Sequence, residues 1–223
     1  MLKVQVLGCG TSSGVPTVLG DWGDCDPSEP KNRRRRASIM LEFNGFTLLV
    51  DTGPDLREQL IDADWDTIDA VFYTHDHADH VNGIDDLRFV SWSQKRGPLP
   101  VYSTADFVSS ITERHQYIFE GFGLYKAFLE AHTLDEKAGT FSFADRDFSF
   151  WRQPHGSVQS LGFRTGNFAY CTDCVDFDET HFARLEGLDV LLVDAVRLEP
   201  HKTHAHLDMV LEWVERLKPK QTY

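Results

Sequence analysis

The segment Thr74-His75-Asp76-His77-Ala78-Asp79-His80 decides both the fold and the chemistry of this chain. It follows an apolar run at residues 70–73, which predicts a buried strand that ends in a loop. The loop then offers three imidazoles and a carboxylate, which are good ligands for divalent metal ions. In an extended loop His75 and His77 project to the same side, so one cation can take both nitrogens. Asp79 and His80 follow where the chain turns toward a helix, which directs them to a second cation. The segment therefore predicts a two-metal site.

Two further ligands are needed to complete such a site, and strand-end loops are where functional groups collect. His155 follows an apolar run at residues 148–151, and Asp173 follows another at 168–170. Because a carboxylate can bind two cations through its two oxygens, Asp173 is the natural bridging ligand. Isolated histidines are more often structural than functional, and this interpretation applies to His115, His132, His181 and His201.

Strand-like and helix-like runs alternate along the chain, which indicates a mixed α/β layer architecture. Asn44-Gly45 and the breaks at 145–147 and 166–167 favour tight hairpin turns, so we expect antiparallel pairing to dominate. The segment 121–139 has weak strand signals and is expected to form a lid or an irregular helical insert. The predicted strands are 4–7, 38–43, 46–50, 70–73, 101–103, 141–143, 148–151, 161–164, 168–170 and 190–193, and the predicted helices are 55–63, 84–93, 105–117, 178–185 and 205–217.

Length and charge narrow the class of protein. A chain of 223 residues with 41% hydrophobic content predicts one domain spanning 1–223. The formal net charge of -13 disfavours binding to nucleic acid or to anionic lipid. No apolar run approaches the roughly 18 to 20 residues that span a bilayer, so no membrane partner is expected. Four scattered cysteines and the absence of a signal-peptide pattern predict a cytoplasmic protein, and a homodimer stays open.

The sequence resembles the metallo-β-lactamase superfamily, whose signature is T-H-x-H-x-D-H. Within that superfamily it resembles the branch of phosphoribosyl cyclic phosphate phosphodiesterases and, more distantly, ribonuclease Z. The resemblance implies an αββα sandwich of two mixed β-sheets flanked by helices, with two divalent metal ions, zinc or manganese, at the sheet edge. The segments that carry it, besides 74–80, are residues 7–16, Val50-Asp51-Thr52-Gly53, Pro154-His155-Gly156 and Tyr170-Cys171-Thr172-Asp173.

Two departures from the family pattern stand out. Members of the family usually supply a seventh ligand, a histidine just after the last strand, whereas this sequence stops at residues 218–223, where that strand should begin. We therefore expect a chain truncated before its last ligand, with a weakened second metal site. Some members of the branch also carry a cysteine-rich structural zinc site, but Cys25 stands alone in its segment, and no such site is expected.

The resemblance implies a phosphodiesterase that cleaves a small nucleotide-like or cyclic ribose phosphate ester with a hydroxide bridging the two metals. Asp79 is expected to hold that hydroxide. The family places a general-acid histidine at the start of the last helix; His206 matches that position best, with His204 as the substitute. Ser12, Ser13 and His204 are candidate substrate contacts.

Other readings of the same residues stay open. A tRNA-processing nuclease or a lactone or thioester hydrolase would use the same metal site. Outside the enzymes, the alternative function is that of a non-catalytic metal-binding or nucleotide-binding protein. Arg33, Arg34, Arg35 and Arg36 are expected to be mostly solvated or paired, and the C-x-x-C spacing of Cys171 and Cys174 is not expected to be redox-active. Substrate and metal identity do not follow from the motif.

Overall fold

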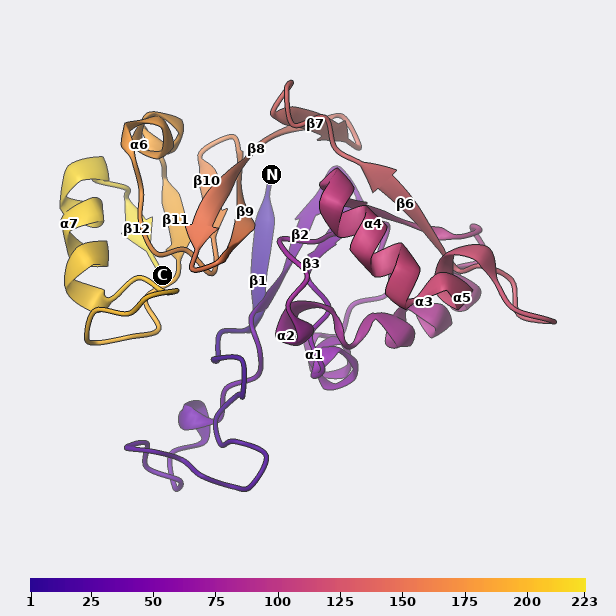
Figure 1. Ribbon diagram of the computed structural model, residues 1–223, viewed down its shortest axis with the longest axis horizontal. Helices are drawn as coiled ribbons and strands as arrows, with labels where there is room; N and C mark the ends of the chain where they lie inside the picture. Colours follow the sequence, from indigo (N-terminus) through magenta and orange to yellow (C-terminus); the bar gives the residue numbers. More distant parts are fainter. The chain divides into compact units, whose positions relative to one another are not determined.

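The computed structural model describes residues 1–223, and its contacts divide the chain into two compact units, Met1–Leu134 and Asp135–Tyr223. Each unit contains one six-stranded sheet (Figure 1). The expectation of a single domain over 1–223 stays a prediction. No helix has the length and apolar character that crossing a membrane requires.

The sheet of the first unit begins antiparallel and becomes parallel. Its first three strands form a meander, and the Asn44-Gly45 turn between β2 and β3 has the positive φ angles of 52° and 79° that a tight hairpin requires. From β3 onward each neighbour runs parallel, so the chain must cross over through helices. The strand order is β1-β2-β3-β4-β5-β6, with bounds Lys3–Gly8, Ser38–Phe43, Phe46–Val50, Ala70–Phe72, Leu99–Ser103 and Leu129–Thr133.

The helices of the first unit pack their apolar residues against this sheet. Leu56 of α1 (Leu56–Ala63), Leu87 of α3 (Leu87–Gln94) and Ile111 of α4 (Ala105–Arg114) share one core with Leu49 and Val71 of the central strands. Both central strands are buried throughout most of their length, as expected of a parallel sheet covered by helices. The elements are η1 (Pro30–Asn32), α1 (Leu56–Ala63), α2 (Ala78–Val81), η2 (Ile84–Asp86), α3 (Leu87–Gln94), α4 (Ala105–Arg114) and α5 (Gln116–Glu120).

The second unit repeats a mixed sheet with its own core. Strands β7, β8, β9 and β10 form successive hairpins, and β10, β11 and β12 run parallel. Helix α7 buries Val210 and Trp213, which join Phe177 and Leu191 in the apolar cluster of this unit. The bounds are β7 (Thr140–Phe143), β8 (Arg146–His155), β9 (Val158–Thr165), β10 (Phe168–Cys171), β11 (Val190–Val193), β12 (Gln221–Thr222), α6 (Glu179–Leu185) and α7 (Leu207–Leu217).

The predicted fold class is confirmed: two mixed sheets are flanked by helices. Antiparallel pairing does not dominate, since parallel and antiparallel neighbours are equally represented in the two sheets. The segment 121–139 is not an irregular insert, because it contains the parallel strand β6. That strand, Leu-Glu-Ala-His-Thr, lacks the β-branched density that identifies buried strands from sequence, so its pairing with β5 decides its structure.

Candidate metal centre

The motif loop of the first unit gathers four potential ligands within a short distance. His75 and His77 follow the end of β4, and Asp79 and His80 lie in the short helix α2. The ring of His75 is centred 4.6 Å from that of His77 and 4.2 Å from that of His80. His80 Nε2 lies 3.5 Å from Asp79 Oδ2. Imidazoles and a carboxylate this close together form a donor set typical of a zinc or manganese site.

A buried carboxylate on the neighbouring strand orients this loop. Asp51 follows β3, and its side chain is fully buried. Asp51 Oδ1 accepts a hydrogen bond from Thr74 N at 2.8 Å, and Oδ2 accepts one from Thr74 Oγ1 at 2.7 Å. Oδ2 also lies 2.7 Å from His80 Nδ1. Burial raises the pKa of Asp51, while His80 and the Thr74 hydrogen bonds oppose that shift. The network ties strand β3 to the metal-ligand loop.

These hydrogen bonds also determine which ring nitrogens are available for a metal. A carboxylate can only accept, so His80 Nδ1 carries the proton and its Nε2 keeps a lone pair. Thr74 Oγ1 donates to Asp51, so at 3.0 Å it accepts from His75 Nδ1–H. His75 likewise presents Nε2. Hydrogen bonding of this kind, in which the second ring nitrogen is held by a carboxylate or hydroxyl, is typical of metal-binding histidines.

Replacing Asp51 by Asn should weaken metal binding by about 10- to 100-fold, the usual effect of removing an outer partner of a ligand. The amide is neutral, and its NH2 group would face at least one of the three donors, Thr74 N, Thr74 Oγ1 and His80 Nδ1, from which the carboxylate accepts. Competition with a chelating dye measures the affinity for zinc and manganese. Asp62→Asn is the matched control, because Asp62 pairs with Arg35 at the surface. Equal affinities for the two variants would contradict this role.

Close backbone packing against Gly53, just after β3, also holds this loop in place. A Cβ at Gly53 would come within 2.3 Å of the Asp79 carbonyl oxygen, so only glycine permits this approach. On the outer side, Ser110 Oγ donates to Asp76 Oδ2 at 2.8 Å, and Arg114 Nη2 lies 3.5 Å from the same oxygen. The loop is therefore anchored to both β3 and α4.

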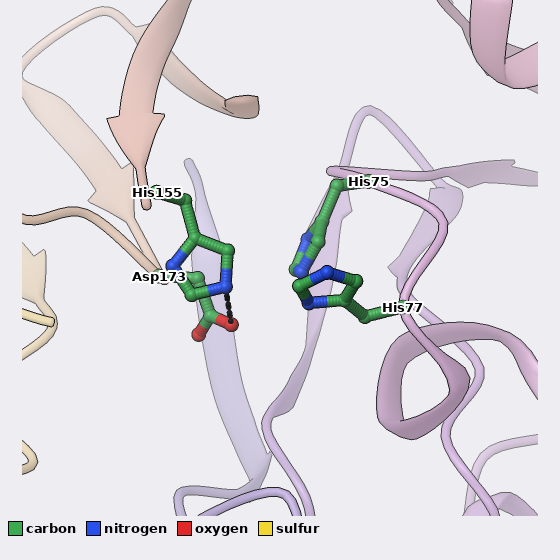
Figure 2. A group of neighbouring side chains, drawn as sticks. All are labelled: His75, His77, His155 and Asp173. Atoms are coloured by element: carbon green, nitrogen blue, oxygen red, sulfur yellow. Dashed lines mark ion pairs between the residues drawn. The ribbon is translucent and has the colours of Figure 1, made fainter. Parts of the chain in front are cut away.

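The second unit contains a histidine and carboxylate pair of its own. His155 ends β8 and Asp173 follows β10, and Figure 2 shows the ion pair between them. His155 Nε2 lies 3.4 Å from Asp173 Oδ2. His155 Nδ1 lies 2.7 Å from the carbonyl oxygen of Thr203 and must donate to it, which leaves Nε2 for a metal. Both predicted ligands of this unit thus lie together, with only 4% of the His155 side chain and 13% of the Asp173 side chain exposed.

A second histidine of this unit, His204, lies beside this pair. His204 Nδ1 lies 2.6 Å from Asp194 Oδ2, and its ring centre is 4.9 Å from that of His155. One ligand atom each of Asp173, Asp194 and His204 lie within 4.8 Å of one another. The hydrogen bond with Asp194 raises the pKa of His204, which burial partly opposes. His206 instead occupies the N-cap of α7, where its side chain makes no capping hydrogen bond.

The sequence analysis assigned no role to Asp51, which it quoted only within the segment 50–53, or to Asp194 and Thr203. Asp51 and Asp194 share one signal that could have found them: each is an acidic residue directly after an apolar strand, at Val50-Asp51 and Val193-Asp194. Thr203 acts through its backbone carbonyl, which leaves no signal in the sequence.

The structure also places the serines, arginines and cysteines that the sequence analysis discussed. Ser12 and Ser13 are exposed, with Ser13 Oγ 3.1 Å from Thr11 Oγ1, and their contact with substrate stays a prediction. Arg35 and Arg36 pair with Asp62 and Asp55, as expected of the arginine run.

Cys171 and Cys174 are free and buried, and burial raises the pKa of both thiols, which disfavours redox chemistry.

Comparison with known proteins places these features in context. The sequence model of the beta-lactamase superfamily domain matches residues 47–223. An octanoyltransferase from Porphyromonas gingivalis is 30% identical over 219 residues, which cover 97% of this chain and 44% of the relative. A ribonuclease Z from Aeropyrum pernix is 26% identical over 66% of this chain and 48% of the relative. The chain thus spans less than half the length of these curated relatives.

Solved structures show a similar architecture over all or most of the chain. A diphosphatase from the PhnP family superposes with a TM-score of 0.88 at 35% identity, covering 100% of this chain and 86% of that structure. The Zn(2+)-bound PqqB from Methylobacterium extorquens superposes with a TM-score of 0.69 at 22% identity, over 89% of this chain and 74% of that structure, which shows a shared fold alone.

Proposed function

The chain belongs to the metallo-β-lactamase superfamily of hydrolases, and from that membership we propose that it is a metal-dependent phosphodiesterase acting on a small phosphate ester. The finer substrate class is a nucleotide-like or cyclic ribose phosphate ester. We propose that it acts in the cytoplasm, where its free cysteines stay reduced. The observation that carries the proposal is the hydrogen bonding of His75, His80 and His155: Nδ1 of each ring is held by a hydrogen bond, which leaves Nε2 for a metal.

We propose that two divalent cations, zinc or manganese, are held by His75, His77, Asp79, His80, His155 and Asp173. Two such cations, when bound, lower the pKa of water and neutralise charge that develops on phosphoryl oxygens. The donor set fits them, because it combines neutral imidazoles with carboxylates and avoids thiolates. Asp79 is proposed both to bind a metal and to orient the attacking water through a hydrogen bond.

We assign the general acid to His204 in place of His206. An ester oxygen that leaves as an alkoxide needs a proton, and an imidazole suits that transfer near neutral pH. Asp194 accepts from His204 Nδ1–H, so Nε2 of the imidazolium carries the proton that faces the substrate. Asp194 is in turn fixed by Val196 N, which donates to Oδ1 at 3.0 Å. Asp194 is therefore a positioning residue, and it acts through His204.

The test of the proposed function is turnover of bis(p-nitrophenyl) phosphate by the purified protein loaded with zinc, manganese or cobalt. We expect hydrolysis that disappears with chelator and returns with metal. The protein should be assayed as the 223-residue chain and with any residues that its gene encodes after Tyr223. Failure of both forms with all three metals, in protein shown by elemental analysis to hold metal, would favour the non-catalytic binding function instead.

The similarity to ribonuclease Z makes a nuclease the second candidate. A net charge of -13 argues against it, since RNA binding depends on neutralising backbone phosphates with lysine and arginine. Precursor tRNA and a cyclic ribose phosphate, compared at equal concentration, separate the two. Cleavage of the RNA with a higher kcat/KM would replace our substrate class with that of a nuclease.

A further inference from the structure

A buried polar pair lies in the sheet of the second unit, next to the backbone of Asp173. Gln153 of β8 and Ser160 of β9 stand opposite each other in the strand register, and both are 0% exposed. Other buried positions of these strands carry apolar side chains, such as Phe150 and Phe163. Because burying a polar group costs free energy unless it is hydrogen-bonded, the contacts of the pair indicate what it does.

The hydrogen-bond donors of this pair end on two peptide carbonyls. Gln153 Nε2 donates one hydrogen to Ser160 Oγ at 3.0 Å and the other to the carbonyl oxygen of Thr172. The Ser160 hydroxyl has a single hydrogen, and it donates to the carbonyl oxygen of Asp173 at 2.8 Å. Since a carbonyl oxygen only accepts, the amide nitrogen of Gln153, and not its oxygen, must face Thr172. The pair therefore holds the carbonyls of residues 172 and 173.

These two carbonyls belong to the peptide groups on either side of the Asp173 Cα. The backbone there is left-handed, with φ at 50°, a conformation that few residues other than glycine adopt. Such a conformation persists only where the surrounding structure fixes it. Hydrogen bonds to both flanking peptide groups restrict φ and ψ of Asp173. They thereby set the direction in which its side chain leaves the backbone.

The carboxylate of Asp173 has a neighbour at each oxygen. Thr172 Oγ1 donates to Asp173 Oδ1 at 3.0 Å. Asp173 Oδ2 lies 3.4 Å from His155 Nε2, the ion pair drawn in Figure 2. A carboxylate that bridges two cations must present one oxygen to each, so a change of backbone direction at this residue displaces both ligand atoms together. Partners one step removed from the ligand atoms tune metal affinity in this way.

We propose that Ser160 and Gln153 are positioning residues for Asp173, which fix its backbone so that the carboxylate presents both oxygens to the metal centre. The assignment rests on the proposed function, in which Asp173 is the ligand shared by two cations. Ser160 holds the Asp173 carbonyl, and Gln153 orients the Ser160 hydroxyl by donating to it. Both residues act through Asp173.

A purely stabilising role fits this pair less well. Gln153 Oε1 is buried and accepts no hydrogen bond from another protein group, which costs free energy. A Cβ at Gly162 would come within 2.6 Å of that oxygen and 2.8 Å of Trp151 Nε1, so this placement of the Gln153 amide requires glycine there. An apolar cross-strand pair would avoid both constraints. Departures of this kind from local packing rules are typical of functional sites.

Removing the Ser160 hydroxyl tests the assignment. Ser160→Ala should weaken the affinity for zinc and manganese at least about 10-fold, as competition with a chelating dye measures. The matched control is Thr165→Val on the same strand, because Thr165 is 2% exposed and its hydroxyl donates to the carbonyl oxygen of Asp147 at 2.9 Å. Both variants lose one buried hydrogen bond from a hydroxyl to a peptide carbonyl. Only in Ser160→Ala does that carbonyl belong to a proposed ligand.

A spectrum separates positioning from stability. The visible absorption of the cobalt-loaded protein reports ligand geometry, so it should change in Ser160→Ala and match the wild type in Thr165→Val. Gln153→Met, which removes both amide donors, is a second variant with the same expectation as Ser160→Ala. Circular dichroism and urea unfolding of the metal-free protein check the fold of each variant. Affinity and spectrum equal to those of Thr165→Val in both Ser160→Ala and Gln153→Met would overturn the proposal.

A double-mutant cycle tests whether Ser160 acts through Asp173. In an Asp173→Asn background, Ser160→Ala should change metal affinity less than about twofold, because the carboxylate that Ser160 positions is already lost. An equal loss in both backgrounds would show that Ser160 acts elsewhere and would overturn the proposal. A wild type that binds no metal would remove the proposed function and this assignment with it. Metal binding that Ser160→Ala leaves unchanged would remove the positioning role alone.

Discussion

Replacing His204 by Ala should lower kcat for bis(p-nitrophenyl) phosphate by about 100-fold or more, with the metal content unchanged. The reason is that the variant keeps every proposed metal ligand and loses only the imidazole that Asp194 holds at 2.6 Å. KM should change less than kcat, because proton donation to the leaving oxygen occurs in the transition state. Steady-state kinetics and elemental analysis of the same preparations measure the two quantities.

His206→Ala is the matched control, since the two histidines precede the same helix. Its kcat should stay close to that of the wild type, because His206 occupies the N-cap of α7 without a side-chain capping bond. If His206→Ala loses activity and His204→Ala does not, the acid is His206. That result would restore the assignment favoured by sequence position.

Replacing Asp173 by Asn should lower kcat/KM by about 1000-fold or more. A neutral amide is a poor substitute for a bridging carboxylate, and metal ions supply several kcal/mol of transition-state stabilisation, each 1.36 kcal/mol of which is tenfold in rate. Asn tolerates the left-handed backbone at this position, where φ is 50°. The loss should therefore reflect chemistry rather than misfolding.

The control for this variant is Asp176→Asn, an exposed carboxylate in the same segment. Metal content per chain should fall in Asp173→Asn and stay constant in Asp176→Asn, as measured by elemental analysis. Full activity and full metal content in Asp173→Asn would remove Asp173 from the metal centre, and the ligand set would then need another carboxylate.

The local parts of the fold followed from the sequence. The strands that flank the ligands were predicted because buried strands are rich in β-branched and aromatic residues, and the Asn44-Gly45 hairpin was predicted because its residues tolerate positive φ. The six ligand residues could be proposed from their clustering and from strand-end positions. What these features share is that each depends on residues close together in the chain.

Other features of the site depend on pairing between segments that are distant in the chain. Asp51 reaches the motif loop because β3 and β4 are parallel neighbours, with Val50 opposite Phe72. His204 is held in place by Asp194, which follows β11 and accepts its hydrogen bond, and its ring lies beside that of His155 on β8.

Strand β6, with little strand signal of its own, forms because β5 provides a partner. Local propensity and spacing thus determine which groups are available. Strand pairing and long-range hydrogen bonds, which join residues far apart in the chain, determine which of those groups meet.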